Sequence, residues 1–152
     1  METGFKVPES VLVVIHTSAF EVLLIERADR AGYWQSVTGS LDAEDEAPAA
    51  AALREVAEET GIVAAPEALK DWRIENRFEI YEWRLPRYRP GVTHNTEHVF
   101  GLTVARDCEV RLAPREHVRH QWLPYREAAS RCFSWSNRDA IELLPQITSR
   151  LR

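Results

Sequence analysis

The sequence has 152 residues, of which 45% are hydrophobic and 28% are charged, and its formal net charge is −5 at pH 7. This length suits one domain with a sizeable core, so we expect residues 1–152 to form a single domain. The acidic balance argues against a nucleic-acid polymer as partner, because no basic stripe is available to neutralise its phosphates. No apolar run approaches the roughly 18 residues of a membrane span and no secretory pattern begins the chain, so we expect a cytoplasmic protein without a membrane partner.

The first third of the chain predicts three strands. Residues 10–16 (SVLVVIH) and 21–26 (EVLLIE) are short β-branched and aliphatic runs, and the polar pair Thr17-Ser18 between them predicts a hairpin. Residues 33–38 (YWQSVT) are the third strand candidate.

A helix is predicted in the second half of residues 39–62. Asp45 is the expected N-cap, Pro48 lies in the first turn where its missing N–H costs little, and Gly61 supplies the stop. The apolar positions recur at spacings of three and four and are expected to face the core. They are Ala49, Leu53, Val56 and Thr60.

The same helix carries Glu55, Glu58 and Glu59 together on another face. Like charges at this spacing repel, and carboxylates in a last turn oppose the negative end of the helix dipole. A solvated surface is therefore a weak explanation for all three. Hard oxygen ligands on one rigid face suit Mg²⁺, which binds few carboxylates and keeps water and substrate phosphates in its other positions.

The rest of the chain alternates strand and helix patterns. We expect an aromatic-rich strand at 71–85, ended by Pro86, further strands at 93–105 and 119–123, and helices at 125–131 and 136–151. Helices against mixed strands predict an α+β fold, built as an α/β/α sandwich. Cys108 and Cys132 are too few for a disulfide framework and are expected to be packing residues.

Residues 39–62 resemble the signature of the Nudix hydrolase family, Gly-x5-Glu-x7-Arg-Glu-U-x-Glu-Glu-x-Gly-U, where U is aliphatic. The match is complete from Glu46 to Ile62. Six residues instead of five separate Gly39 from Glu46, and we expect Asp42 or Asp45 to take a left-handed turn there. The resemblance implies the Nudix fold, a mixed sheet between helices.

Three further segments resemble the bacterial dihydroneopterin triphosphate diphosphatases, a group within that family. They are residues 33–39, 89–97 and 134–138. The resemblance implies Mg²⁺-dependent hydrolysis of dihydroneopterin triphosphate to the monophosphate and diphosphate, a step of folate synthesis, with Mn²⁺ as the substitute ion. Two alternatives stay open: a diphosphatase for (d)NTPs or oxidised nucleotides, and a non-catalytic nucleotide-binding Nudix module. The intact carboxylates disfavour the second.

The resemblance also implies the catalytic and metal-binding residues. Glu55 and Glu59 would be metal ligands, Glu58 a metal-site or water-activating partner, and Arg54 the residue that orients them, with Glu46 as its counter-ion. A distal ligand from outside the helix is expected at Glu116, for which Glu97 is the competitor. The general base, the number of metal ions and the oligomeric state are left open.

Substrate contacts are implied in two groups. Lys6, Arg27 and Thr38 match basic and hydroxyl positions that contact substrate in this subgroup. Aromatic planes suit a flat heterocycle, although aromatics at alternating strand positions are also typical of a core. The residues that match the pterin end are Phe78, Glu79, Ile80, Tyr81, Ser134 and Trp135.

Overall fold

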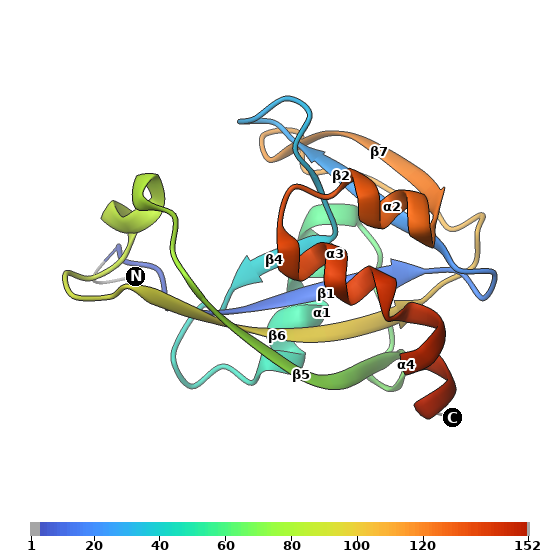
Figure 1. Ribbon diagram of the computed structural model, residues 1–152, viewed down its shortest axis with the longest axis horizontal. Coiled ribbons are helices and arrows are strands. Elements are labelled where there is room, and N and C mark those ends of the chain that lie inside the picture. The colour runs from blue at the N-terminus through green and yellow to red at the C-terminus, as the bar shows by residue number, and fades with distance from the viewer. Residues whose placement is uncertain (1–3, 152) are drawn as a thin grey trace.

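The centre of the fold is a parallel pair of strands, β1 (Glu9–His16) and β6 (His94–Thr103), in a computed structural model that describes residues 4–151 (Figure 1). Their register runs from Glu9 opposite Thr96 to His16 opposite Thr103. Strand β5 (Leu69–Glu79) pairs antiparallel with the far edge of β6. Because β1 is aliphatic and almost wholly buried, it fixes the middle of the sheet.

The other edge of β1 is shared by two strands. Strand β4 (Val37–Ser40) pairs with it from Ser10 to Val13, whereas β2 (Glu21–Arg27) pairs only where the hairpin closes, at His16 opposite Val22. Strand β2 then diverges and takes β3 (Trp34–Gln35) and β7 (His117–Pro124) as its own partners. The described part of the sheet thus divides into two branches that separate from β1.

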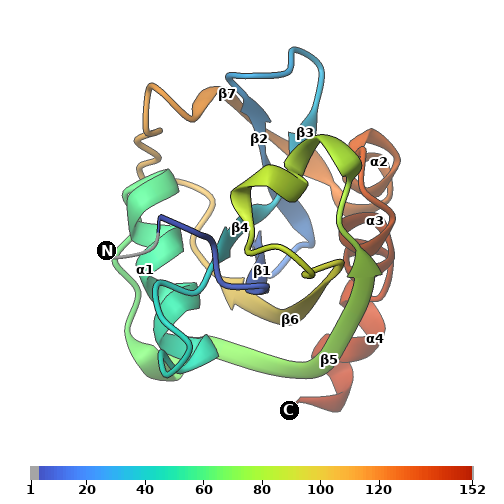
Figure 2. The ribbon, with the colours of Figure 1, turned by 90° about the vertical axis from the view of Figure 1, so that its left-hand side faces the viewer.

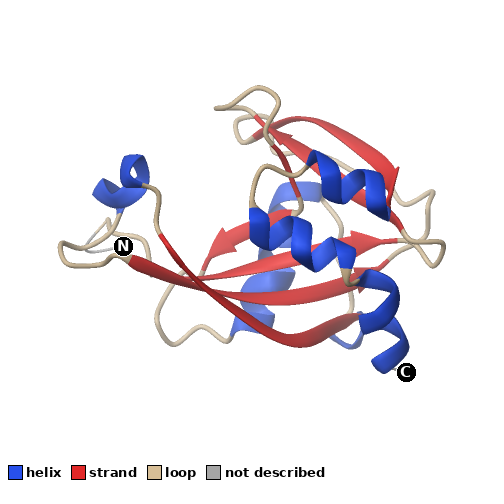
Figure 3. Ribbon diagram, in the orientation of Figure 1, coloured by secondary structure: helices blue, strands red, loops and turns tan. Residues whose placement is uncertain are grey.

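Helices cover both faces of the sheet (Figures 2 and 3). Helix α1 (Pro48–Thr60) lies on one face, and α2 (Tyr125–Arg131), α3 (Trp135–Glu142) and α4 (Leu144–Arg150) lie on the other. Alternate residues of β1 enter two separate core clusters, as the pleat of a strand requires. Val11, Val13 and Ile15 pack on the α1 side, and Leu12 and Val14 on the other. The predicted α+β sandwich is confirmed.

Helix α1 ends as predicted but begins later. Gly61 is its C-cap at φ 75°, a left-handed conformation that glycine adopts without strain. The prediction of Asp45 as N-cap is wrong, because Ala47 occupies that position and Pro48 follows in the first turn. Of the predicted apolar stripe, Val56 and Thr60 are buried, Leu53 is half-buried and Ala49 is exposed. Ala51 and Ala52 are buried instead, so the core-facing side is rotated from the predicted one.

Two strand predictions need correction. Residues 33–38 do not form one strand, because the chain bends at Ser36 between β3 and β4. Residues 71–85 do not continue as a strand beyond Glu79, since Glu82–Arg87 forms the 3-10 helix η2. The last ladder bond is donated by the N–H of Ile80 to the carbonyl of Thr93, after which the chain leaves the sheet.

The predicted helix at 136–151 is two helices, α3 and α4, with the break at Leu143. Pro145 explains the break, because proline has no N–H to donate to the carbonyl four residues earlier and its ring crowds that turn. The predictions of the hairpin, of β6, of β7 and of α2 agree with the structure to within two residues at each end. Another 3-10 helix, η1 (Pro66–Ala68), leads into β5.

Cys132 is buried in the core cluster beneath α2 and α3, and Cys108 is half-buried; both are free thiols. Among residues 4–151, no helix combines the length and the apolar character needed to cross a membrane.

Candidate active site

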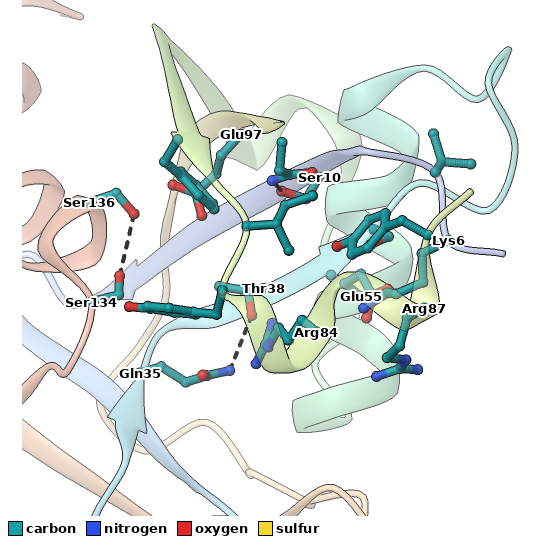
Figure 4. A pocket seen from close by; sticks show the side chains of 18 of the residues that line it. Lys6, Ser10, Gln35, Thr38, Glu55, Arg84, Arg87, Glu97, Ser134 and Ser136 are labelled. Atoms are coloured by element: carbon teal, nitrogen blue, oxygen red, sulfur yellow. Dashed lines mark hydrogen bonds between the residues drawn. The ribbon is translucent and has the colours of Figure 1, made fainter. Parts of the chain in front are cut away.

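A pocket of about 690 Å³ opens where β4 leaves β1 and where β6 begins (Figure 4). Its walls come from residues 4–7, from β4 and α1, from residues 78–88 and from residues 133–137. All nine predicted substrate-contacting residues line it: Lys6, Arg27, Thr38, Phe78, Glu79, Ile80, Tyr81, Ser134 and Trp135. Of the predicted metal ligands, Glu55, Glu59 and Glu116 line the pocket as well.

Arg54 ties the loop before α1 to the helix itself. Its guanidinium donates to both carboxylate oxygens of Glu46, each at 3.1 Å, and to the carbonyl of Ser40 at 3.2 Å. On the helix it reaches Glu55 at 3.0 Å and Glu58 at 3.4 Å. The expected pairing of Arg54 with Glu46 is therefore present. This bidentate contact lowers the pKa of Glu46 and raises that of Arg54.

The loop between Gly39 and Glu46 closes without the expected left-handed aspartate. Neither Asp42 nor Asp45 has a positive φ, so that prediction is wrong. Instead, the Glu46 carboxylate accepts a hydrogen bond from the N–H of Asp42 at 2.7 Å, and the N–H of Glu46 donates to the carbonyl of Ala43. The side chain of Glu46 thus organises the longer loop and spares it a strained backbone.

Gly39 allows a close approach between β4 and a side chain of α1. Its backbone on β4 lies directly against the carboxylate of Glu55, and a Cβ added there would overlap that side chain. The glycine therefore lets the helix carboxylate reach the β4 wall of the pocket.

Glu59 lies deeper than Glu55. Only 3% of the residue is exposed, and its Oε1 has no hydrogen-bond partner among residues 4–151. Burial raises the pKa of Glu59 well above its ordinary value, and the carboxyl of Glu55 and the charge of Glu116 raise it further. His117 Nε2 lies 3.9 Å from Glu59 Oε1, but burial lowers the pKa of His117 to about 4, so the imidazole is neutral at pH 7. Among residues 4–151, no cation therefore balances the charge of the Glu59 carboxylate.

The remaining acidic residues lie in different places. Glu58 is on the outer side of α1, with 54% of its side chain exposed, and it pairs with Arg54 instead of lining the pocket. Glu116 lies just before β7, held by a hydrogen bond from the N–H of Ala28 to its carbonyl, and its charge acts on Glu59. Glu97 is on β6 and hydrogen-bonds Asn76 and Ser136, away from the carboxylates of α1.

The residues present fit a hard divalent cation. No three His, Cys, Asp or Glu side chains among residues 4–151 are grouped closely enough to hold a metal ion by themselves. Glu55 and Glu59 nevertheless bring two carboxylates together, one of them with an unpartnered buried oxygen. Such ions need few protein carboxylates where water and phosphate oxygens complete their coordination.

A group of cationic side chains lies near these acids in the pocket, and only half of it was predicted from the sequence. Lys6 and Arg27 were predicted, whereas Arg84, inside the predicted strand 71–85, and Arg87, just beyond Pro86, were missed. Burial and the charges of Arg87 and Arg84 lower the pKa of Lys6 to about 8, and burial together with Arg27 lowers that of Arg84. Four cations that line one pocket form a site for an anion.

The opposite end of the pocket is aromatic and polar. Phe78 and Trp135 meet edge to face with ring centroids 6.4 Å apart, and 46% of Trp135 is exposed. Ser134 caps α3 by accepting a hydrogen bond from the N–H of Asn137. Asn95, Glu97, Ser136 and Asn137 also line this end and were not predicted as substrate contacts. Figure 4 shows Glu97 and Ser136 on one side and Lys6, Glu55 and Arg87 on the other.

Comparison with known proteins identifies a family. The model for the NUDIX domain matches residues 6–144. Dihydroneopterin triphosphate diphosphatase of Escherichia coli K12 is 43% identical over 141 residues, covering 91% of this chain and 92% of the relative. The enzyme of the same name from Haemophilus influenzae is 35% identical, covering 91% and 87%. The solved structure of the E. coli dihydroneopterin triphosphate pyrophosphohydrolase superposes with a TM-score of 0.82 at 42% identity, covering 91% of this chain and 94% of that one.

Glu59→Gln should stabilise the metal-free protein. The substitution keeps the shape of the side chain, removes the cost of ionising a buried carboxyl, and provides an amide N–H that can donate to Glu55. We expect the free energy of unfolding in EDTA at pH 7.5 to rise by about 1 kcal/mol. Urea unfolding of parent and variant measures it, with Glu58→Gln as the exposed control. A clearly less stable variant would mean that the Glu59 carboxylate has a structural partner.

Proposed function

This chain belongs to the NUDIX domain family, and from that premise we propose that it hydrolyses dihydroneopterin triphosphate to dihydroneopterin monophosphate and diphosphate, using Mg²⁺. The observation that carries the proposal is one pocket that brings together buried carboxylates, four cations and an aromatic end. A relative that is 43% identical over 91% of the chain and bears the name of this activity supports the same substrate. Mn²⁺ is proposed as the substitute ion.

We propose that Glu55, Glu59 and Glu116 hold the metal from the pocket side, with Glu58 as a metal-site or water-activating partner. When bound, the ion would supply charge neutralisation for the phosphates and lower the pKa of a bound water. Arg54 is assigned an orienting role, because its guanidinium contacts Glu55 and Glu58 from one side and the preceding loop from the other.

The cationic group would hold the polyphosphate. Lys6, Arg27, Arg84 and Arg87 present positive charge to the pocket, and among residues 4–151 only Arg27 of these four forms an ion pair, with Asp29 at 2.8 Å. Water then adds to the α-phosphorus and gives up a proton to a nearby carboxylate, the anhydride bond between the α- and β-phosphates breaks, and the diphosphate departs with its electron pair. The chain's cations hold the charge of the β- and γ-phosphates, which is present in the substrate and in the departing diphosphate alike.

We further propose that residues 1–152 work as one domain in the cytoplasm. The family match over residues 6–144 and a shared sheet with helices on both faces support one domain. The proposed substrate and the two free thiols support the cytoplasm.

The first test is the product and its metal dependence. Purified protein and dihydroneopterin triphosphate should release diphosphate in one step in Mg²⁺, and activity should disappear in EDTA and return with Mg²⁺ or Mn²⁺. Free phosphate measured with and without added inorganic pyrophosphatase separates the products. Stepwise release of phosphate, or full activity in EDTA, contradicts the proposal, and faster turnover of dATP or 8-oxo-dGTP would favour a nucleotide diphosphatase.

Glu116→Gln should lower kcat on every triphosphate tested by at least tenfold and raise the Mg²⁺ concentration needed for half-maximal rate. The reason is that loss of one metal-facing charge weakens the site for the ion and not for the heterocycle. Arg115→Gln, next in sequence and exposed, is the matched control. Unchanged Mg²⁺ dependence in Glu116→Gln would remove Glu116 from the metal site.

Arg84→Gln should raise KM for the triphosphate about tenfold with little change in kcat, because it removes a contact made equally in the ground and transition states. Thermal stability should not fall, since the variant relieves repulsion among the four cations. Arg77→Gln, an exposed arginine on β5, is the control. An unchanged KM would show that Arg84 does not contact the phosphates.

A further inference from the structure

Two hydrogen-bond acceptors lie side by side at the end of the pocket farthest from the α1 carboxylates. Asn95 and Glu97 are two residues apart on β6 and therefore project from the same face of the strand. Both line the pocket, although only 5% of Asn95 and 6% of Glu97 are exposed. Neither was needed to account for the metal site or the phosphate site.

Within residues 4–151, Asn95 has an unpartnered acceptor, and Glu97 is hydrogen-bonded by neutral side chains. Asn95 donates through Nδ2 to the hydroxyl of Ser10 at 2.7 Å, and its Oδ1 has no partner. Asn76 Nδ2 lies 3.4 Å from Glu97 Oε1, a long contact, and Ser136 is the other neighbour that hydrogen-bonds this carboxyl. None of the ion pairs in this part of the chain includes Glu97. A buried acceptor without a donor costs free energy, so Asn95 Oδ1 calls for a donor from a ligand. The carboxylate of Glu97 beside it can accept further hydrogen bonds, because each oxygen has more than one lone pair.

Burial raises the pKa of Glu97, which is the expected response of a carboxyl that has lost water and gained no cation. If the role of this position were purely structural, glutamine would suit it better than glutamate. Glutamine could accept the same hydrogen bonds from Asn76 and Ser136 without any charge to desolvate. The acid is therefore better explained by what it accepts when the pocket is filled.

The aromatic pair lies next to these acceptors. In the register of β5 and β6, Phe78 is opposite Asn95 and Asn76 is opposite Glu97, and Trp135 packs against Phe78. A flat ring placed against these aromatics would present its edge to β6. The polyphosphate would extend toward Lys6 and Glu55, which Figure 4 shows across the pocket from Glu97.

We propose that Glu97, with Asn95 beside it, selects the heterocycle by accepting hydrogen bonds from the edge of a 2-amino-4-oxopyrimidine ring. That ring carries a ring N–H and an amino group next to each other, two donors that match the two oxygens of one carboxylate. Adenine offers an amino donor beside a ring-nitrogen acceptor, which would place a lone pair against the carboxylate. The inference rests on the proposed function. It assigns to Glu97 and Asn95 the preference of the pocket for pterin or guanine rings over adenine.

The parent protein provides the first measurement, which needs no variant. GTP, ITP and ATP carry the same triphosphate and differ at the ring edge, since ITP lacks only the 2-amino group and ATP presents the adenine edge. As competitors of dihydroneopterin triphosphate hydrolysis, GTP should bind about tenfold or more tightly than ITP, and ATP should bind more weakly than GTP. Equal inhibition constants for GTP and ITP would overturn the proposal.

Glu97→Gln provides the second measurement. Glutamine keeps the shape but turns one acceptor into a donor that faces the donors of the ring, so kcat/KM for dihydroneopterin triphosphate should fall about 10- to 100-fold, mainly through KM. The difference between GTP and ITP should shrink, and ATP binding should weaken by no more than about twofold. Glu75→Gln, an exposed glutamate on β5, is the control for loss of a charge near β6.

The outcomes separate the two proposals. A parent protein that does not hydrolyse dihydroneopterin triphosphate contradicts the proposed function. If the parent is active and Glu97→Gln keeps its discrimination between ring edges, the function stands and the assignment of Glu97 is wrong. Equal loss on all triphosphates with a raised Mg²⁺ requirement would place Glu97 in the metal site and overturn the assignment as well.

Discussion

The site depends on one guanidinium. Arg54 is three-quarters enclosed and is the cation that lies against Glu46, Glu55 and Glu58 at once. Carboxylates gathered on one helix face repel one another, and the negative C-terminal end of the helix dipole destabilises them further. A shared bidentate partner offsets that repulsion and fixes the loop through the Ser40 carbonyl. Glu55 can therefore point into the pocket without the helix end losing order.

A second constraint places β4 correctly over the helix. The chain bends at Ser36 as it passes from β3, which pairs with β2, to β4, which pairs with β1. Asn137 on α3 holds the bend: its Oδ1 accepts from the N–H of Ser36 at 2.8 Å, and its Nδ2 donates to the Ser36 hydroxyl at 3.0 Å. With both residues buried, these bonds have no competition from water. The α3 segment that lines the aromatic end of the pocket thus also positions β4, which forms the wall next to Glu55.

The parts of this site that the sequence predicts are those set by neighbours along the chain, and the parts that it does not predict depend on contacts between distant segments. Spacing on a helix is local, so the shared face of Glu55 and Glu59 could be predicted from the residues alone. The pairing of Arg54 with Glu46, which lies before the helix, was implied only by the family resemblance. The 3-10 helix η2 could not, because Phe78 to Leu85 has strand-like composition and only the loss of a sheet partner after Ile80 turns the chain. Arg84 and Arg87 were missed with it. The left-handed aspartate was expected because a loop with one extra residue needs closing, and a side chain, Glu46, closes it instead.

The pocket holds acids and cations near one another without pairing them. Lys6 and Arg87 lie on the same side of the pocket as Glu55 (Figure 4), yet no ion pair joins the cationic group to Glu55 or Glu59 among residues 4–151. Burial raises the pKa of Glu59 and lowers that of Lys6, so each group disfavours its own charge. Direct pairing would relieve both, as it does for Arg54 and Glu46. The unpaired arrangement is instead suited to a ligand that carries both signs, a divalent cation together with a polyphosphate, because the cation compensates the carboxylates and the phosphates compensate the cationic group. Binding of the two should therefore be coupled, since each bound partner favours the other.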